Sequence, residues 1–362
     1  MADPSSFIGR PITALPTPAL VVDPQALERN LQYLARYFRE RACKLRPHFK
    51  SHKCVTLAHA QLAAGSATGM TCATLAEAEA LVAGDLADVL IANQVVGAGK
   101  PARLAALNQG ALVRAAVDSA GNVADLGAAA REAGVTLGLL VEVDIGMGRC
   151  GVPPGPAAVE LARRVAETPG LRFDGLQGYE GHAVMRPDPE ERRKLVEEAM
   201  DLLLATRREV EAAGLPVSIV SSGGTGTYDL TGNTPGVDEV QAGSYALMDA
   251  AYRKVRPEFE AARFVLATVI STAGGRAVVD VGTKGLGGEF GPPVVLGHPE
   301  GEVRKVAEEH TIIDGLPVKA GDLVKLLPSH GCTTNNLYRR MWIVRGGVLE
   351  ELWPIQASGG PG

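Results

Sequence analysis

Short apolar runs alternate with longer segments of helical periodicity from about residue 40 to 250, and this alternation constrains the fold more than any other feature. Strands joined by amphipathic helices have to run parallel, because the crossover helix returns the chain to the same end of the sheet. Eight strand–helix units predict a closed (β/α)8 barrel of the TIM type, with an open doubly wound sheet as the alternative. The expected strands cover residues 44–51, 68–74, 88–96, 111–119, 137–144, 173–181, 217–224 and 238–245.

The character of the sequence changes after residue 255. Short β-rich runs follow, such as FVLATVIST and RMWIVRGG, and glycine and proline separate them. These runs predict a second, all-β domain, to which we also assign the early strand TPALVVD because it precedes the eight barrel strands. The sequence thus predicts a barrel domain over residues 24–255 and a β domain made of residues 1–23 and 256–362.

Composition and charge restrict the class of function. The net charge is −5 without a basic stripe, which argues against a nucleic-acid partner, and no apolar run approaches the roughly 20 residues of a membrane span. The N-terminus carries neither a basic leader nor an apolar export segment, and the 5 cysteines are scattered and odd in number. We therefore expect a soluble cytoplasmic protein that acts on a small molecule and binds neither membrane nor nucleic acid.

The segment RPHFKSHK, residues 46–53, is the densest cluster of functional side chains. In an extended strand, a period of two places His48, Lys50 and His52 on one face. A lysine at the mouth of a barrel is desolvated, which favours the neutral, nucleophilic amine that forms a Schiff base. A solvated edge strand with basic residues is the alternative interpretation.

Two glycine-rich segments follow the seventh and eighth expected strands. In (β/α)8 barrels, the loops after these two strands often bind a phosphate group, through backbone N–H groups and hydroxyls. A single glycine turn would be weak evidence, but two such loops opposite a lysine are more specific. The candidate phosphate ligands are Gly223, Gly224 and Thr225 in VSSGGTG and Gly243 and Ser244 in QAGSY.

Two further loops bring polar side chains to the same expected face of the barrel. Asp144 and Arg149 lie in VEVDIGMGRCG after the fifth strand, and Tyr179 and His182 lie in QGYEGH after the sixth. Glycine lets the backbone pass close to a ligand, so that Arg149 and Tyr179 can reach a cofactor ring. Taken singly, each of these residues also fits a turn or a core position.

In the expected β domain, PSHGCTTNN places His330 and Cys332 two residues apart, on one face if the segment is extended. Imidazole and thiolate are good ligands for a divalent metal, but two ligands are too few for a closed structural site. The pair therefore indicates an open, catalytic metal site, and a buried histidine and cysteine at a turn are the alternative.

In this order, TPALVVD, RPHFKSHK, VEVDIGMGRCG, QGYEGH, SSGGTGTY, EVQAGSYALMD and PSHGC resemble the D-threonine aldolase and D-serine dehydratase family. The resemblance extends along nearly the whole chain. It implies the alanine-racemase-like fold, which is fold type III of pyridoxal-phosphate enzymes: a (β/α)8 barrel plus a β domain. It also implies a homodimer in which two subunits complete the active site.

The resemblance implies a role for each candidate residue. Lys50, with His48 beside it, would bind pyridoxal 5'-phosphate and move the proton at Cα, while Arg149 and Tyr179 would contact cofactor or substrate. His330 and Cys332 would bind a divalent cation, manganese, magnesium or zinc, beside the β-hydroxyl of the substrate. The residues that would hold the phosphate or lie beside it are Gly223, Gly224, Thr225, Gly243, Ser244 and Tyr245.

We therefore expect a D-threonine-aldolase-type lyase that cleaves β-hydroxy-D-amino acids to glycine and an aldehyde. The alternative is a D-serine or 3-hydroxyaspartate dehydratase, which releases a keto acid and ammonia. The well-known aldolases resemble His-x-Asp at the metal position, whereas the dehydratases resemble His-x-Cys, as His330 and Cys332 stand here. A racemase, with Tyr252 or His182 as second base, and a non-catalytic cofactor carrier are less favoured.

Overall fold

The structure is a computed structural model that describes residues 3–359, and it divides into two compact units. The first, the barrel unit, consists of Leu34–Lys50 and Ala58–Gly243. The second, the sheet unit, contains the chain up to Tyr33, Ser51–Leu57 and the chain from Ser244 onward. The domain borders expected at residues 24 and 255 stay a prediction, and the outermost residues of the expected β domain lie outside the described residues.

The barrel unit contains an 8-stranded parallel sheet in the order β2-β9-β8-β7-β6-β5-β4-β3. Parallel bridges between Leu45 and Ala67 and between His48 and Thr71 connect the two end strands, so the sheet curls back on itself. The expected barrel is confirmed. Its strands are β2 (Lys44–Leu45), β3 (Met70–Cys72), β4 (Asp88–Gln94), β5 (Leu112–Val117), β6 (Leu137–Glu142), β7 (Leu171–Gln177), β8 (Ile219–Ser222) and β9 (Glu239–Val240).

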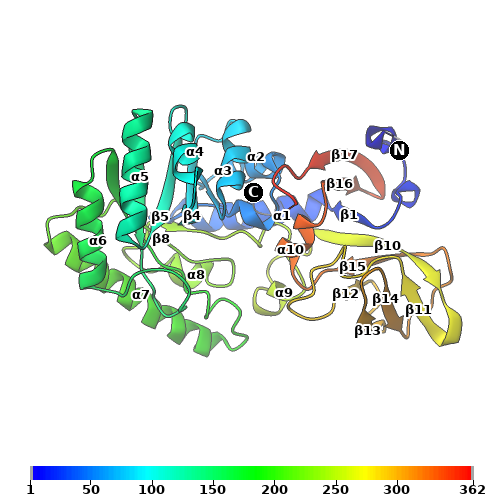
Figure 1. The fold of residues 1–362 in the computed structure, drawn as a ribbon. Helices are drawn as coiled ribbons and strands as arrows, with labels where there is room; N and C mark the ends of the chain where they lie inside the picture. The colour runs from blue at the N-terminus through cyan, green and yellow to red at the C-terminus, as the bar shows by residue number, and fades with distance from the viewer. Residues whose placement is uncertain (1–2, 360–362) are drawn as a thin grey trace. The chain divides into compact units, whose positions relative to one another are not determined.

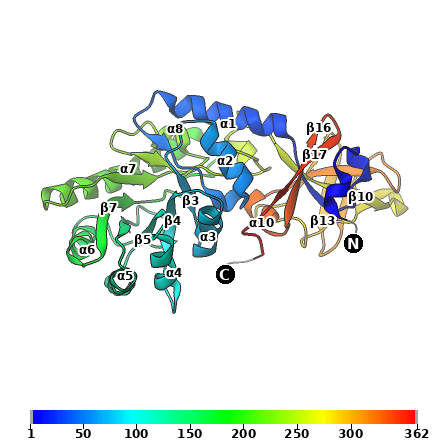
Figure 2. The same ribbon diagram turned by 90° about the horizontal axis from the view of Figure 1, so that it is seen from above.

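Helices cover the outer side of these strands, as the amphipathic segments predicted (Figure 1). Figure 2 shows α3, α4, α5 and α6 outside β3, β4, β5 and β7. Side-chain caps begin several of them: Thr74 accepts the Glu77 N–H, and Ser119 accepts the Asn122 N–H. The helices are α1 (Pro24–Arg39), α2 (Val55–Ala63), α3 (Leu75–Ala83), α4 (Lys100–Leu107), α5 (Ala120–Ala133), α6 (Pro156–Glu167), α7 (Pro189–Ala212) and α8 (Tyr228–Thr231).

The first barrel strand is shorter than expected. It ends at Leu45, and Phe49–Ser51 form the 3-10 helix η3, so Lys50 lies on a turn after the strand. Ladder contacts continue for three residues beyond the strand: the Arg46 N–H donates to the Val240 carbonyl at 2.9 Å, and the His48 N–H donates to the Ala242 carbonyl at 3.1 Å, while Pro47 between them has no N–H to donate. The predicted alternation of His48, Lys50 and His52 on one strand face is therefore wrong.

The sheet unit is built on the order β13-β14-β11-β10-β1-β16-β17, with β15 pairing to β10 and β12. The early strand β1 (Ala19–Val22) pairs antiparallel with β10 and parallel with β16, so its expected place with the late strands is confirmed. The late strands are β10 (Arg263–Ser271), β11 (Arg276–Val279), β12 (Val294–Leu296), β13 (Glu302–Val306), β14 (Thr311–Asp314), β15 (Leu323–Leu327), β16 (Arg340–Arg345) and β17 (Val348–Pro354).

Val21, Phe264, Leu266, Trp342 and Leu349 pack in the core of this sheet, which explains why its strands read as apolar runs. Short helices complete the unit: α9 (Tyr252–Val255), α10 (Gly331–Asn336), η1 (Pro4–Phe7), η2 (Ile12–Ala14) and η4 (Ala273–Gly275). Among residues 3–359, no helix combines the length and hydrophobicity that crossing a membrane requires.

Candidate active site

Three predicted residues meet around the ring of Tyr179 in the barrel unit. The Lys50 Nζ lies 5.9 Å from the ring centroid, and the Arg149 Cζ lies 5.6 Å from it. Lys50 comes from η3 after β2, Arg149 from the loop after β6, and Tyr179 from the segment after β7. The carboxyl ends of these strands meet at one face of a barrel, which is where (β/α)8 enzymes place their reacting groups.

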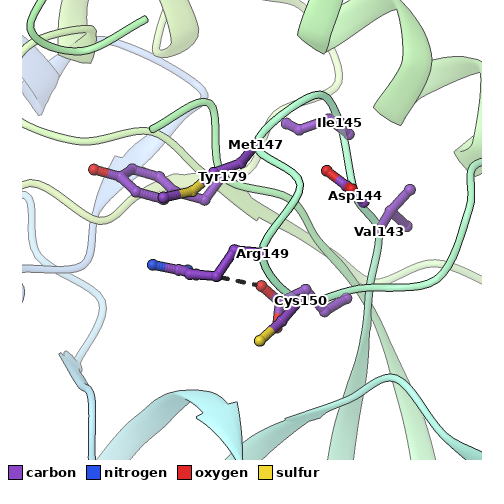
Figure 3. Close-up of a pocket in the computed structure, with 8 residues that line it drawn as sticks. Val143, Asp144, Ile145, Met147, Arg149, Cys150 and Tyr179 are labelled. Carbon is purple, nitrogen blue, oxygen red and sulfur yellow. Dashed lines mark ion pairs between the residues drawn. The ribbon is translucent and has the colours of Figure 1, made fainter. Parts of the chain in front are cut away.

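The loop that presents Arg149 is held by its own backbone. The Asp144 Oδ1 accepts the N–H groups of Gly146 at 3.1 Å and Gly148 at 3.0 Å, and a parallel bridge joins Val143 to Val152. The N–H of Gly148, followed by that of Gly146, lowers the pKa of Asp144 in spite of some burial. Asp144 thus stabilises a turn that points Arg149 toward Tyr179 (Figure 3).

Glu142 lies at the end of β6 and lines the same pocket as Arg149 and Tyr179. It is buried, its Oε2 accepts a hydrogen bond from the Gln94 Nε2 at 2.6 Å, and its Oε1 lies 4.0 Å from an Arg149 nitrogen (Figure 3, dashed line). Burial raises the pKa of Glu142, while the bond from Gln94 and the charge of Arg149 oppose that rise. A carboxyl group therefore accompanies the guanidinium at this site.

The turn after β8 is organised around Glu180, which is fully buried. The Glu180 Oε2 accepts the Ser222 hydroxyl and the Gly223 N–H, both at 3.1 Å, and its Oε1 accepts the hydroxyls of Thr227 at 2.7 Å and Thr231. Gly223 has a φ of +78°, a left-handed conformation that favours glycine. The contribution of Gly223 to a phosphate site is then conformational, because its N–H already donates to Glu180.

This arrangement fits pyridoxal phosphate. A Cβ built on Gly224 would lie 3.5 Å from the Tyr179 ring, so the glycine turn comes close to this ring. The Lys50 Nζ and the Arg149 Cζ lie within 6 Å of the centroid of the same ring. Thr225 follows in the same buried turn, with 2% of its surface exposed. A lysine amine, an aromatic ring, a cation and a glycine turn in one place are the groups that this cofactor requires.

The expected metal pair lies in the sheet unit, and its segment is not extended. His330 precedes the short helix α10 and Cys332 lies within it, so the extended segment on which a shared strand face depended is not formed. The two side chains are nevertheless close, because His330 and Cys332 share a hydrogen bond at the helix start. Burial disfavours the charged imidazole, but the bonds with Cys332 and Glu289 together raise the pKa of His330.

The donor chemistry of this pair fits an open divalent site. The His330 Nδ1 lies 2.8 Å from the Glu289 Oε1, a carboxylate contact that orients many metal-binding imidazoles and leaves Nε2 for the metal. Phe290 packs on the imidazole, with 4.4 Å between the ring centroids. Within the described residues, no set of three or more His, Cys, Asp and Glu side chains could hold a metal.

The remaining predicted residues fall in both units. Gly243 ends the barrel unit, and Ser244 and Tyr245 begin the sheet unit. The Ser244 Oγ lies 4.0 Å from the Cys332 Sγ, and Tyr245 is buried with its ring centroid 5.9 Å from that of Phe259. The structure thus places Ser244 next to the expected metal pair, a contact that the phosphate interpretation did not include.

The two residues considered as a second base belong to different units. The ring of His182 lies beside Gly146 in the barrel unit, and its Nδ1 is buried without a hydrogen-bond partner among the described residues. Tyr252 begins α9 in the sheet unit and donates its N–H to Asp249 at 2.9 Å.

Sequence reasoning missed the acidic partners of the site, Glu142, Glu180 and Glu289. The first two stand inside apolar or glycine-rich stretches, VEVD and YEGH, where an acidic residue is unusual. That position was the available signal. Nothing in the sequence links Glu289 to His330, which lies 41 residues further along the chain.

Comparisons with known proteins agree with this geometry. The family model described as the N-terminal domain of alanine racemase matches residues 22–251, and a serine dehydratase domain model matches residues 262–344. A 3-hydroxy-D-aspartate aldolase of Paracoccus denitrificans is 37% identical over 97% of this chain and 96% of its own length. A D-threo-3-hydroxyaspartate dehydratase of Delftia is 32% identical over 77% of this chain and 75% of its own.

The crystal structure of a D-threonine aldolase from Filomicrobium marinum superposes with a TM-score of 0.94, at 40% identity, covering 97% of this chain and 98% of that one. The chain belongs to the alanine racemase N-terminal domain family, the fold type III pyridoxal-phosphate enzymes. Within that family it groups with the 3-hydroxy-D-aspartate and D-threonine aldolases and their dehydratase relatives. The resemblance inferred from the motifs is confirmed.

Proposed function

We propose that the chain is a lyase that depends on pyridoxal phosphate and a divalent metal and cleaves β-hydroxy-D-amino acids to glycine and an aldehyde. The observation that carries the proposal is the position of Lys50 and Arg149, 5.9 and 5.6 Å from the centroid of one tyrosine ring, beside a glycine turn. The aldolase relatives, similar over almost the full length of both chains, support the reaction type.

The residues of the barrel unit would hold the cofactor and move protons. Lys50 would bind the cofactor aldehyde and carry the proton to and from the substrate Cα, with His48 close in the chain. Arg149 and Tyr179 would orient the ring and the substrate carboxylate. The cofactor, when bound, supplies the electron sink that stabilises negative charge at Cα. The turn that contains Gly223, Gly224 and Thr225, together with Gly243, Ser244 and Tyr245, would bind the phosphate.

His330 and Cys332 would hold the divalent cation, manganese, magnesium or zinc. Such an ion lowers the pKa of a neighbouring hydroxyl, which assists loss of the β-hydroxyl proton when the Cα–Cβ bond breaks. Glu289, bonded to the His330 Nδ1, would keep the opposite nitrogen directed at the ion.

A dehydratase is the second candidate, because the residue two positions after His330 is a cysteine rather than an aspartate. In that reaction Lys50 removes the Cα proton, and the β-hydroxyl leaves, so that the products are a keto acid and ammonia. A thiolate changes the metal preference more directly than the choice of bond to be cleaved. We therefore rank the aldolase first.

Product analysis separates the two reactions. The purified protein is incubated with pyridoxal phosphate, Mn²⁺ and, in separate samples, D-threonine, 3-hydroxy-D-aspartate and D-serine. Glycine and an aldehyde in equal amounts are expected from the first two substrates. Ammonia and a keto acid without glycine would establish the dehydratase instead. Inversion of the configuration at Cα, without glycine or ammonia, would indicate a racemase, and no turnover with full cofactor binding would indicate a carrier.

Several expectations belong to the same proposal. We propose a homodimer, a cytoplasmic location, no membrane or nucleic-acid partner, and a division of labour in which residues 24–255 bind the cofactor and the β domain binds the metal. The mass of the protein in solution, measured by light scattering during size-exclusion chromatography, tests the dimer directly.

A further inference from the structure

A fully buried ion pair lies beneath the expected metal pair in the sheet unit. Asp249 and Arg263 both have 0% side-chain exposure, and 3.8 Å separates the Asp249 Oδ2 from an Arg263 nitrogen. Removing two charges from water costs more than their attraction usually returns, so such a pair is weak evidence for stability. Stability alone therefore does not explain why this ion pair is buried here.

The pair holds the backbone of Gly331 from both sides. The Gly331 N–H donates to the Asp249 Oδ2 at 2.9 Å, and an Arg263 nitrogen donates to the Gly331 carbonyl at 3.0 Å. Each partner is fixed in turn: the Asp249 Oδ1 accepts the Tyr252 N–H at 2.9 Å, and the Arg263 Nε donates to the Met248 carbonyl at 2.8 Å. Gly331 is thus held at both of its polar backbone groups.

Gly331 is the residue between His330 and Cys332. A Cβ at this position would lie 1.4 Å from an Arg263 nitrogen, so the guanidinium occupies the space that any other residue would need. The two expected ligands, His330 and Cys332, are the chain neighbours of Gly331. The position of the Gly331 backbone therefore fixes the two Cα positions from which the imidazole and the thiol extend. A site with only two protein ligands depends strongly on such preorganisation.

We propose that Asp249 and Arg263 are positioning residues that hold His330 and Cys332 in the arrangement that binds the divalent metal. This inference rests on the proposed function in one respect, namely that His330 and Cys332 bind a metal. The inference predicts that replacing either residue lowers the affinity for the metal by more than a loss of folding stability alone would cause. A purely structural pair would instead lower stability and leave metal affinity unchanged.

The test compares Asp249→Asn with Asp280→Asn in the full-length protein. Asp280 lies in the same unit and, like Asp249, accepts a backbone N–H, that of Thr268 at 2.7 Å, but its described bonds go to Thr17 and Thr268. Each metal-free protein is titrated with Co²⁺ while the thiolate-to-cobalt absorption band is recorded. Thermal unfolding of each metal-free protein is measured in parallel.

We expect Asp249→Asn to weaken Co²⁺ binding by about tenfold or more, the usual effect of removing an outer-shell partner, and to alter the cobalt band. Asp280→Asn should keep the wild-type affinity within about twofold, even if both variants unfold at lower temperature. Wild-type affinity and an unchanged band in Asp249→Asn would overturn the inference, and so would an equal loss in both variants.

A second variant covers the case in which Asp249→Asn does not fold. Arg263→Lys keeps the buried charge but lacks the planar set of donors, so it should weaken Co²⁺ binding while folding; wild-type binding in this variant would equally overturn the inference. The reference is Cys332→Ser. If the wild type shows no thiolate-to-cobalt band, or Cys332→Ser retains it, the proposed metal site itself fails. That outcome differs from a band that is present in the wild type, lost in Cys332→Ser and unchanged in Asp249→Asn, which would overturn only the positioning role.

Discussion

The Glu180 Oε2 accepts the N–H of Gly223 at 3.1 Å, so a buried carboxylate lies directly behind the turn that the sequence predicts to bind phosphate. Two hydroxyls from α8 and its preceding residue, those of Thr231 and Thr227, reach the other oxygen of the same carboxylate. The shape of the turn therefore depends on a residue that approaches it from the end of β7. A negative charge behind the turn is tolerated because four donors surround it.

Replacing Glu180 with glutamine should lower the affinity for pyridoxal phosphate about tenfold, since one acceptor oxygen becomes an amide NH2 group, which only donates, and the bonds that hold the turn weaken. The loss should be larger for pyridoxal phosphate than for pyridoxal, which lacks the phosphate. Cofactor titration followed by protein fluorescence measures both affinities. Glu191→Gln, an exposed position on α7, is the control, and equal losses for the two ligands would contradict the prediction.

The cofactor shows a visible absorption band when it is covalently bound to the protein. Lys50→Ala should abolish this band and should reduce turnover below detection. The reason is that no other amine is expected to replace the Lys50 Nζ beside Tyr179. Lys194→Ala, which changes a lysine that is 76% exposed on α7, should keep band and activity. A band that persists in Lys50→Ala and disappears on replacing a different lysine would disprove the assignment.

Glu142→Gln should change how stability depends on pH. Burial raises the pKa of Glu142 above the ordinary value of a glutamate side chain, so the folded state holds the proton at a higher pH than the unfolded state does. Stability contributed by the protonated form is present below the unfolded pKa and is lost as pH rises through the folded pKa. The melting temperature of the variant, relative to wild type, should therefore increase as pH rises from the acidic range toward neutrality.

Melting curves at a series of pH values, without cofactor, measure this difference. Glu160→Gln on α6, where 65% of the side chain is exposed, provides a control that should stay parallel to the wild type. A difference between Glu142→Gln and wild type that decreases with pH would show that the bond from Gln94 and the charge of Arg149 outweigh burial, and a constant difference would show that they balance it; either result would contradict the prediction.

Glu289→Gln should weaken divalent-metal binding about tenfold, because the carboxylate at 2.8 Å from the His330 Nδ1 orients the imidazole. The chain offers a matched control in Glu300→Gln, since Glu300 makes a comparable contact of 3.0 Å with His298 in the same unit. Titration with Mn²⁺, followed by electron paramagnetic resonance of the free ion, measures both. Equal affinities for Glu289→Gln and Glu300→Gln would exclude an orienting role for Glu289.

The sequence predicts the architecture well because long-range order in a barrel follows from local alternation. Each apolar run marks a strand and each amphipathic segment marks a helix, so counting them suffices for the topology. The same logic fails at β13, whose residues Glu302–Val306 are mostly exposed and show no apolar alternation. It fails again after β2, where the backbone turns into the 3-10 helix η3 within five residues of the strand end.

The sequence predicts those site residues whose side-chain type already indicates a chemical role. Lys50, Arg149 and Tyr179 are conspicuous in glycine-rich loops, and the structure brings them together. Their acidic partners escape prediction because a glutamate in a sequence does not show whether it is exposed or surrounded by donors. Asp249 and Arg263 form a pair only in three dimensions, since it is the fold that brings both to Gly331.

The central place of β1 between β10 and β16 has a consequence for synthesis of the chain. Residues Ala19–Val22 leave the ribosome long before both neighbouring strands, Arg263–Ser271 and Arg340–Arg345, have been translated. The N–H and C=O groups of this apolar strand therefore lack their sheet partners during much of translation, a state that favours aggregation or chaperone binding. Deleting either terminus should damage the same sheet, so a shortened chain from either end would be expected to lose the sheet unit first.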